Sequence, residues 1–219
     1  MPKLFLIYLL IILSSCSSIE RNRIAPGYSE AYSAVKNVLF GYDPMLISND
    51  TISSIPYASL ILKIGKGPEG LLILQSKENH NESWVSSDGA LFVINRGKIT
   101  KTAGIENNLK RLLYSDESIT QNLDNNKNTY LAYYSYDSPP LIDLRVEAKL
   151  INKGKERTKL RFGERELNLI EEHITNQQIG WRAVNKYWID DQNYVWKSEQ
   201  SISPRLPTIY YEITKKPSE

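Results

Sequence analysis

Residues 84–105 constrain the fold more than any other part of the chain. Within this stretch, Asp88 with Gly89 and Arg96 with Gly97 each place a glycine where a tight turn needs a positive φ. The apolar run between the two turns, residues 90–95, is too short for a helix and is typical of a strand. Two turns so close together predict an antiparallel meander that forms one wall of the core.

Strand-like patterns continue on both sides of this meander. The pattern at residues 142–151 is the clearest, because Ile142, Leu144 and alternate residues up to Leu150 are apolar, which places them on one face. Asn152 to Gly154 then predicts a turn. Strands are also predicted at residues 58–64, 71–76, 129–134, 159–162, 165–175, 181–189, 194–203 and 208–215, although residues 166–173 also fit a helix.

Other segments interrupt this strand pattern. Helical spacing of apolar residues predicts a short N-terminal helix over residues 28–39 and another over residues 105–113. Polar loops are predicted at residues 77–81 and 115–128. The chain is therefore expected to be mostly β, with antiparallel meanders forming a barrel-like or sandwich-like domain over residues 28–219.

A weak internal repeat is the basis for predicting two similar halves in this domain, residues 28–114 and 129–219, the alternative being a chance likeness of two meanders. Residues 84–92 and 188–196 align without gaps, each starting with a tryptophan. The turn pair Asp88 and Gly89 aligns with Gln192 and Asn193. Asparagine adopts positive φ more readily than other non-glycine residues, so the two turns are expected to share a geometry.

The N-terminus carries an export signal rather than part of the fold. Residues 1–15 contain Lys3 and a short apolar run, residues 4–13, which is too short to span a bilayer. The sequence Leu13-Ser14-Ser15-Cys16 resembles a bacterial lipobox, and Cys16 is the single cysteine of the chain. We therefore predict that Cys16 is lipidated, the alternative being an ordinary signal peptide with a cysteine nearby.

Lipidation would attach the mature protein to a membrane essentially permanently, because each buried methylene group contributes about 0.8 kcal/mol. Ser17 follows the cysteine, and under the enterobacterial sorting convention a serine there indicates the periplasmic face of the outer membrane. Residues 16–27 are predicted to form the acylated tether. No later stretch is apolar enough for a transmembrane helix.

Charge and motifs exclude several functional classes. The chain has 27 basic and 25 acidic residues, without the concentrated basic patch of a nucleic-acid-binding protein. His80 and His173 lie in unrelated contexts, which predicts no metal site and no cofactor. Neither a nucleophile elbow nor a phosphate-binding loop is present. The carboxylate pairs Glu171 with Glu172 and Asp190 with Asp191 are expected to be solvated, since adjacent strand residues point to opposite faces.

Several motifs in the first half, in a fixed order behind the lipobox, resemble the YjbF/GfcB family of group 4 capsule polysaccharide lipoproteins. The resemblance covers most of the mature chain and is densest over residues 43–105. Its motifs are Tyr42-Asp43-Pro44, Ile55-Pro56-Tyr57-Ala58-Ser59, Trp84 with Ser87-Asp88-Gly89, Arg96-Gly97-Lys98-Ile99 and Lys101-Thr102-Ala103-Gly104-Ile105. The resemblance implies an all-β, barrel-like outer-membrane lipoprotein needed to make or export an exopolysaccharide beside an outer-membrane barrel protein. It implies no catalytic residues.

Three hypotheses about function follow. The first is a non-catalytic accessory that binds the polysaccharide or an export partner, the second an enzyme that modifies or trims the polymer, and the third a structural envelope adaptor. For the accessory hypothesis, the turn at Asp88 and the loop after Thr102 are expected to share one end of the meander. Asp88, Lys101 and Thr102, with the ring of Trp84, are then the candidate binding residues.

Overall fold

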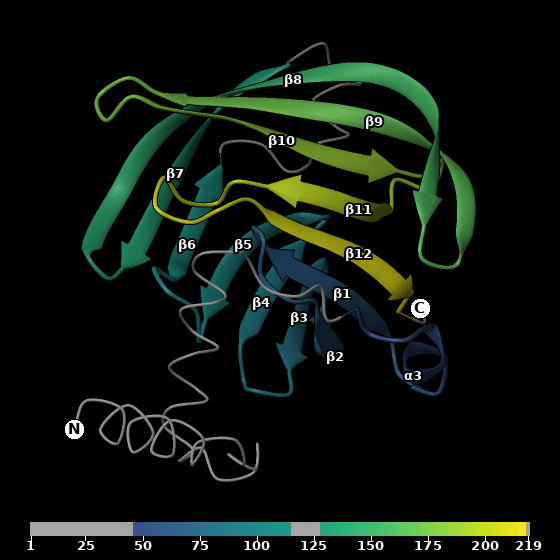
Figure 1. Cartoon of the computed structure of the whole chain (residues 1–219). Coiled ribbons are helices and arrows are strands. Elements are labelled where there is room, and N and C mark those ends of the chain that lie inside the picture. The colour runs from purple at the N-terminus through teal and green to yellow at the C-terminus, as the bar shows by residue number, and fades with distance from the viewer. Residues whose placement is uncertain (1–45, 115–127, 218–219) are drawn as a thin grey trace, which may run out of the picture. The chain divides into compact units, whose positions relative to one another are not determined.

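A computed structural model of the chain describes residues 46–114 and 128–217 (Figure 1). The one helix in these ranges is α3 (Asn49–Ser53), which Ser48 caps by accepting a hydrogen bond from the Thr51 amide. The strands are β1 (Ser59–Ile64), β2 (Gly70–Glu78), β3 (Asn81–Ser86), β4 (Leu91–Asn95), β5 (Lys98–Ala103), β6 (Leu109–Tyr114), β7 (Thr129–Asp137), β8 (Pro140–Leu160), β9 (Gly163–Asn176), β10 (Trp181–Ile189), β11 (Val195–Gln200) and β12 (Ile209–Lys215).

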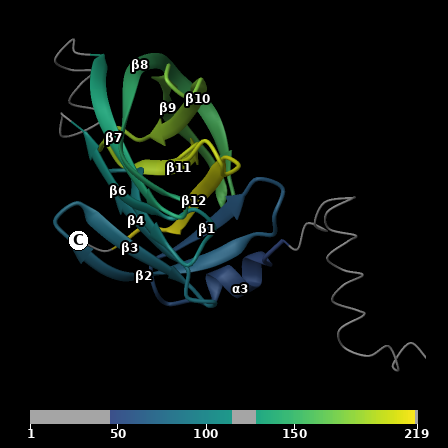
Figure 2. The same cartoon turned by 90° about the vertical axis from the view of Figure 1, so that its left-hand side faces the viewer.

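The strands form one 12-stranded antiparallel sheet in the order β5-β4-β3-β2-β1-β12-β11-β10-β9-β8-β7-β6. The sheet curls until its two edge strands approach each other, which makes a nearly closed barrel (Figures 1 and 2). The Leu109 amide of β6 donates a hydrogen bond of 2.9 Å to the Thr102 hydroxyl of β5. The expectation of a mostly β, barrel-like domain is confirmed.

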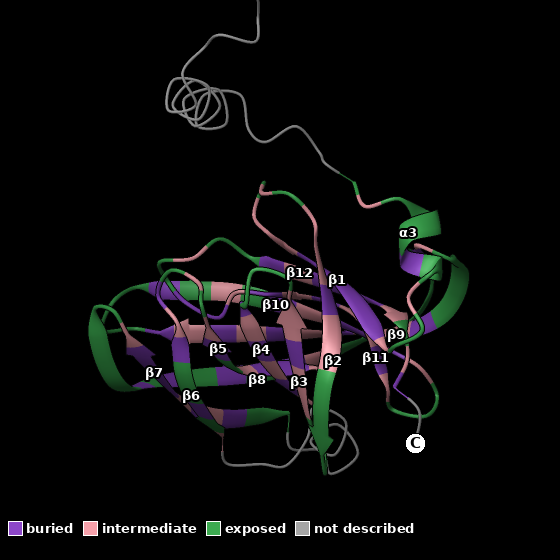
Figure 3. Ribbon diagram, turned by 90° about the horizontal axis from the view of Figure 1, so that it is seen from below, coloured by how far each residue is buried: buried purple, intermediate pink, exposed green. Residues whose placement is uncertain are grey.

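The core fills the inside of this barrel. Buried and exposed residues alternate along most strands, as the banded colouring of Figure 3 shows, because successive side chains point to opposite faces of a sheet. The largest fully buried side chains include Trp84, Tyr134, Tyr187 and Tyr211. Much of the aromatic content of the sequence is therefore core and does not form a surface platform for sugars.

Both turns of the central meander are confirmed. Gly89 and Gly97 each have φ of 86°, and Arg96 has φ of 47°. The turn at Asn193 also has a positive φ, 62°, as the internal repeat predicts. The backbone amide of Asn193 donates a hydrogen bond to the Asp190 carbonyl, as the backbone amide of Gly89 does to the Ser86 carbonyl, both at 3.0 Å. The two turns share a geometry, whereas duplication of a whole half stays a prediction.

The predicted helix over residues 105–113 is wrong, because residues 109–114 form the edge strand β6. The pairing of β6 with β7 shifts register between Leu109 and Arg111. This bulge turns both Leu109 and Leu112 towards the core and leaves Leu113 exposed. Buried residues three positions apart imitate the spacing of a helix, which explains the error.

Two irregularities in β8 also differ from expectation. Gly154, predicted to end a strand, instead has φ of 88° within a bulge, and the strand continues to Leu160. Asp143 has φ of 52°, which interrupts the alternation of buried and exposed side chains before Leu144 and leaves Ile142 76% exposed.

The predicted loop over residues 77–81 is a tight turn centred on Asn79 and His80.

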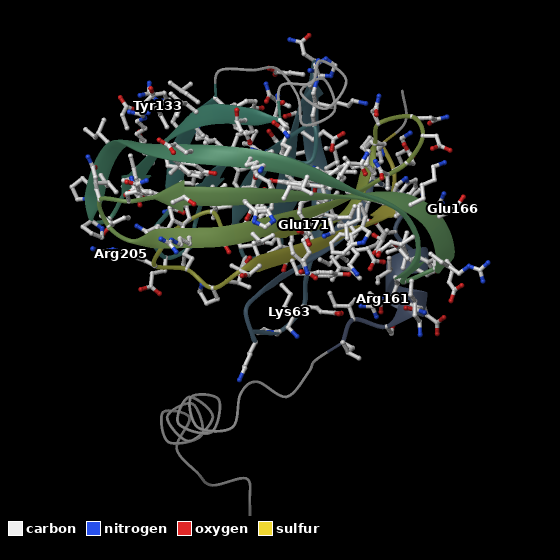
Figure 4. The ribbon with its side chains drawn as sticks, turned by 90° about the horizontal axis from the view of Figure 1, so that it is seen from above. Lys63, Tyr133, Arg161, Glu166, Glu171 and Arg205 are labelled. Atoms are coloured by element: carbon white, nitrogen blue, oxygen red, sulfur yellow. The ribbon has the colours of Figure 1, made fainter. Side chains whose placement is uncertain are left out.

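The β8–β9 hairpin extends beyond the barrel wall and folds back against the outside of the sheet. Residues Leu160 and Leu167 of the hairpin form a second apolar cluster with Trp188. Arg161, at the hairpin tip (Figure 4), donates a hydrogen bond of 2.6 Å to the carboxylate of Glu69. Residues 165–175 are strand, so the helical alternative is wrong.

Several predictions fall outside the described residues. These are the signal peptide and lipobox, the tether, the helix over residues 28–39 and nearly all of the loop at residues 115–128. In the part of the chain that the structure describes, no helix has the length and apolar character needed to cross a membrane.

Candidate functional site

The two ends of the barrel carry different turns. One end, here called the His80 end, carries the β2–β3 turn at His80, the β4–β5 turn at Gly97 and the β10–β11 turn at Asn193. The other, the Gly89 end, carries the β3–β4 turn. A cavity of about 450 Å³ opens at the His80 end, within the 300–1,000 Å³ range of small-molecule sites. Its lining comprises Lys77, Asn79, His80, Glu82, Ile94, Arg96, Gly97, Gln192, Asn193, Tyr194, Val195, Tyr211, Ile213, Lys216 and Pro217.

Positive charge dominates this lining. Lys77, Arg96 and Lys216 face a single carboxylate, Glu82. Burial raises the pKa of the Glu82 carboxyl, and this effect is partly offset by the positive charge of Lys77, a hydrogen bond from the Trp84 indole and the positive charge of Lys216. The cavity is therefore electropositive and contains one partly desolvated acid.

Two hydrogen-bond donors near Glu82 are buried. The phenol hydroxyl of Tyr194 has no partner among the described residues, whereas the indole N–H of Trp84 lies close enough to the Glu82 carboxylate to lower its pKa. Burial raises the pKa of Tyr194, and the nearby Glu82 charge raises it further, so this hydroxyl stays protonated. A buried donor without a partner costs about 1–3 kcal/mol, which a bound polar molecule or water at the Tyr194 hydroxyl would offset.

The floor of the cavity is rigidly built. The carbonyl oxygen of Gly97 accepts hydrogen bonds from the Tyr211 hydroxyl at 2.7 Å and from the side-chain amide of Gln200 at 2.8 Å. Gly97 also packs so closely on Val195 that an added Cβ would lie 2.2 Å from a Val195 methyl group. These contacts fix the β4–β5 turn against strands on the opposite side of the barrel.

A buried ion pair lies inside the barrel beyond this floor. The Lys98 ammonium group donates to the carboxylate of Glu172 and to the hydroxyl of Tyr130. The second carboxylate oxygen of Glu172 accepts hydrogen bonds of 2.8 Å from the side-chain amide of Asn185 and from the Tyr187 hydroxyl. Burial acts to lower the pKa of Lys98, but the charge and hydrogen bond of Glu172, together with Tyr134 and Tyr114, outweigh burial and the pKa is raised. We assign this network to stability, since both charges are paired and inaccessible.

The structure separates the four binding residues predicted from sequence. The Asp88 turn and the loop after β5 do share the Gly89 end, because an added Cβ at Gly104 would lie 3.1 Å from Ala90 Cα. Trp84 is fully buried, however, and Thr102 is only 1% exposed. Neither can offer a ring or a hydroxyl to a sugar at that surface, which corrects the expectation for these two residues.

Asp88 and Lys101 are exposed at or near the Gly89 end. The Ser86 hydroxyl donates a hydrogen bond to the Asp88 carboxylate, and this bond, with the Ala90 amide, lowers the pKa of Asp88. Asp88 thus caps its own turn. As binding residues, Asp88 and Lys101 stay a prediction.

The carboxylate pairs behave differently from one another. Glu171 points outwards, where its carboxylate lies 3.1 Å from the His173 ring (Figure 4). Glu172 is fully buried, so the expectation that it is solvated is wrong, although the two side chains do diverge as predicted. Asp190 accepts a hydrogen bond of 2.8 Å from the Trp196 indole, and Asp191 forms an ion pair of 2.8 Å with Lys155.

Residues 46–114 and 128–217 contain no cluster of acidic, histidine or cysteine side chains able to hold a metal.

The residues of the cavity escaped the sequence analysis because they come from distant segments. Glu82 lies on β3, Tyr194 in the β10–β11 turn and Lys216 after β12. These segments meet at the cavity only when the sheet curls. One available signal was the charge of Glu82, which lies two positions from Trp84 and so shares its inward face in β3.

Comparison with known proteins identifies the family. The family model described as group 4 capsule polysaccharide lipoprotein GfcB, YjbF matches residues 32–214. The chain belongs to this family. The resemblance inferred from the motifs is therefore confirmed, together with membership of a lipoprotein family associated with capsule polysaccharide.

Individual relatives agree with this assignment. The uncharacterized lipoprotein YjbF of Escherichia coli K12 is 26% identical over 200 residues, covering 89% of each chain. The uncharacterized lipoprotein GfcB of the same strain is 22% identical over 156 residues, covering 69% of this chain and 72% of its own. The crystal structure of the E. coli K12 hypothetical lipoprotein YmcC has a TM-score of 0.65 at 17% identity, over 90% of this chain and 98% of that one. These descriptions indicate no enzymatic activity.

Proposed function

We propose that this family member is a lipid-anchored, non-catalytic accessory in exopolysaccharide or capsule export that binds the polysaccharide in the cavity at the His80 end. The observation that carries the proposal is the cavity itself, which is polar and charged and contains a buried hydroxyl donor that has no partner in residues 46–114 and 128–217. Sugars offer many hydroxyl groups, which both donate and accept hydrogen bonds. The match is therefore one of chemistry as well as of size.

The membrane attachment completes the proposal. Cys16 carries the lipid, residues 16–27 form the tether, and the β domain faces the periplasm from the outer membrane. This position allows contact with polymer in transit and with an outer-membrane barrel protein of the same export system. Support comes from the lipobox sequence and from membership of a lipoprotein family.

Replacing Cys16 with serine should abolish lipidation, because the acyl acceptor is the cysteine sulfur. We expect metabolic labelling with a radioactive fatty acid to mark the wild-type protein and not Cys16→Ser. Membrane fractionation should find the wild type in the outer membrane. A labelled variant, or a wild type recovered as free protein, would refute the anchor.

The accessory role is tested by deleting the gene in the parent bacterium and measuring polymer inside and outside the cells. We expect surface polymer to fall while newly made polymer still accumulates, and a plasmid copy of the wild type to restore export. Unchanged surface polymer would exclude the role in export. Complete loss of synthesis would point instead to an enzyme of polymer production.

A hydrolytic function has less support from the same site. Glycoside hydrolases need two carboxyl groups on either side of the scissile bond, roughly 5–10 Å apart. Among the described residues that line the cavity, Glu82 is the only acidic one. The cavity therefore offers recognition chemistry without the second carboxylate that hydrolysis of the polymer would require.

A further inference from the structure

We infer that the cavity at the His80 end selects acidic saccharides, whose carboxylate or other anionic substituent is held by Lys77, Arg96 and Lys216. This inference rests on the proposed function and adds the chemical class of the ligand. A neutral sugar of the same shape should bind more weakly, because it leaves the positive charge of the site unmatched.

The charges of the lining support this selection. Three permanently cationic side chains face one carboxylate, so the cavity keeps an excess of positive charge when Glu82 is ionised. The excess is larger when Glu82 is protonated, which its burial favours. Arginine and lysine bind carboxylates through charge-assisted hydrogen bonds, about twice as strong as neutral ones.

The Lys216 side chain lines the cavity and is positioned by two contacts. Its ammonium group lies 4.7 Å from the centre of the Tyr194 ring and 3.3 Å from the side-chain oxygen of Gln192. These two contacts leave further donor capacity on an ammonium group that has three N–H bonds. Tyr194 belongs to the same lining, and its buried hydroxyl, which has no partner among the described residues, can donate to a sugar oxygen.

The mouth of the cavity is pre-organised for such a ligand. Asn79 and Asn193 occupy positive φ values of 55° and 62° in two of the turns that form the rim. The third turn is fixed by the hydrogen bonds to Gly97 O. A rim of short turns loses little conformational entropy on binding, which favours affinity from few contacts.

The test measures binding of two matched oligosaccharides to the full-length lipoprotein in detergent micelles by isothermal titration calorimetry. The acidic probe is tri-galacturonate, and the neutral probe is the same trimer with every carboxylate methyl-esterified. We expect the acidic trimer to bind at least about tenfold more tightly, the effect of one charge-assisted hydrogen bond. Its affinity should fall with rising salt.

Two double variants assign the effect to the cavity. Lys77→Gln with Lys216→Gln removes two cations from the lining and should reduce affinity for the acidic trimer by about tenfold or more, a larger loss than for the neutral trimer. Lys66→Gln with Lys110→Gln removes the same charge from exposed positions outside the cavity and should change neither affinity. Melting curves of both variants verify that they are folded.

The outcomes separate the inference from the proposed function. Equal affinity for the two trimers, unaffected by either double variant, would overturn the preference for acidic sugars while leaving saccharide binding in place. Equal loss of affinity in both double variants would show a general charge effect and would also overturn the cavity assignment. Binding of neither trimer nor of the native polymer would contradict direct saccharide binding itself.

Discussion

Glu172→Ala should lower the free energy of unfolding by about 3–5 kcal/mol and the melting temperature by about 6–20 °C. The substitution leaves the Lys98 ammonium buried without its counter-charge and removes the acceptor for Asn185 and Tyr187. An uncompensated buried charge is among the largest single costs that a folded protein can incur. Thermal unfolding followed by circular dichroism measures the change.

The neighbouring residue supplies a matched control. Glu171→Ala removes the same side chain one position away on the outer face, where the carboxylate contacts His173 and lies 3.9 Å from Lys153. Exposed pairs of this kind contribute about 0–1 kcal/mol. Equal destabilisation by the two variants would contradict the role assigned to the buried pair.

The ion pair also predicts a pH dependence. The pKa of Lys98 is raised in the folded chain, so the pair stabilises fully below the unfolded value of about 10.4, and its contribution is lost as pH rises through the folded-state pKa. Wild-type stability should therefore fall in the alkaline range more steeply than that of Lys98→Met with Glu172→Gln. Urea unfolding over this range measures the difference, and parallel curves would refute it.

Gly97→Val should destabilise the domain by about 2–6 kcal/mol, the sum of strain from a β-branched residue at positive φ and of overpacking. An added Cβ would meet Val195 at 2.2 Å, on a strand across the barrel. The change should also distort the cavity floor, since the Gly97 carbonyl is held there by Tyr211.

Gly89→Val separates the two causes. Gly89 has the same φ of 86°, but no atom of the described residues lies within 4 Å of an added Cβ. Gly89→Val should therefore show the backbone strain alone, about 1–3 kcal/mol. A Gly97→Val protein that melts at the same temperature as Gly89→Val would show that contact with Val195 contributes nothing to stability.

Local patterns predicted the local structure well. Turns at Gly89 and Gly97 follow from glycine chemistry, and the alternation from Leu144 to Leu150 follows from the period of a strand. These signals act between near neighbours, so no knowledge of pairing is needed to interpret them. They also sufficed to predict a barrel-like sheet.

The errors arose where pairing between strands decides the outcome. The bulge beside Leu109 changes which residues are buried, and only the pairing of β6 with β7 determines it. Glu172 faces the interior of the barrel, where Lys98, from another part of the sequence, pairs with it. Nothing near Glu172 in the sequence indicates that partner.

The candidate site shows the same limit. Trp84 looked available to a sugar because its neighbours form turns, yet it is fully buried within the barrel. The cavity brings together Glu82, Tyr194 and Lys216, which are far apart in sequence. Sequence analysis therefore predicted the class of fold and the family, whereas the residues of this cavity could be recognised only in the folded chain.

Amide hydrogen exchange of the full-length lipoprotein in micelles, with and without fragments of the native polysaccharide, tests the central claim most directly. We predict that the polymer slows exchange at the turns around His80, Gly97 and Asn193, which form the cavity rim, and leaves the turn around Gly89 unchanged. Protection confined to the Gly89 end, or no protection at saturating polymer, would contradict a polysaccharide site in this cavity.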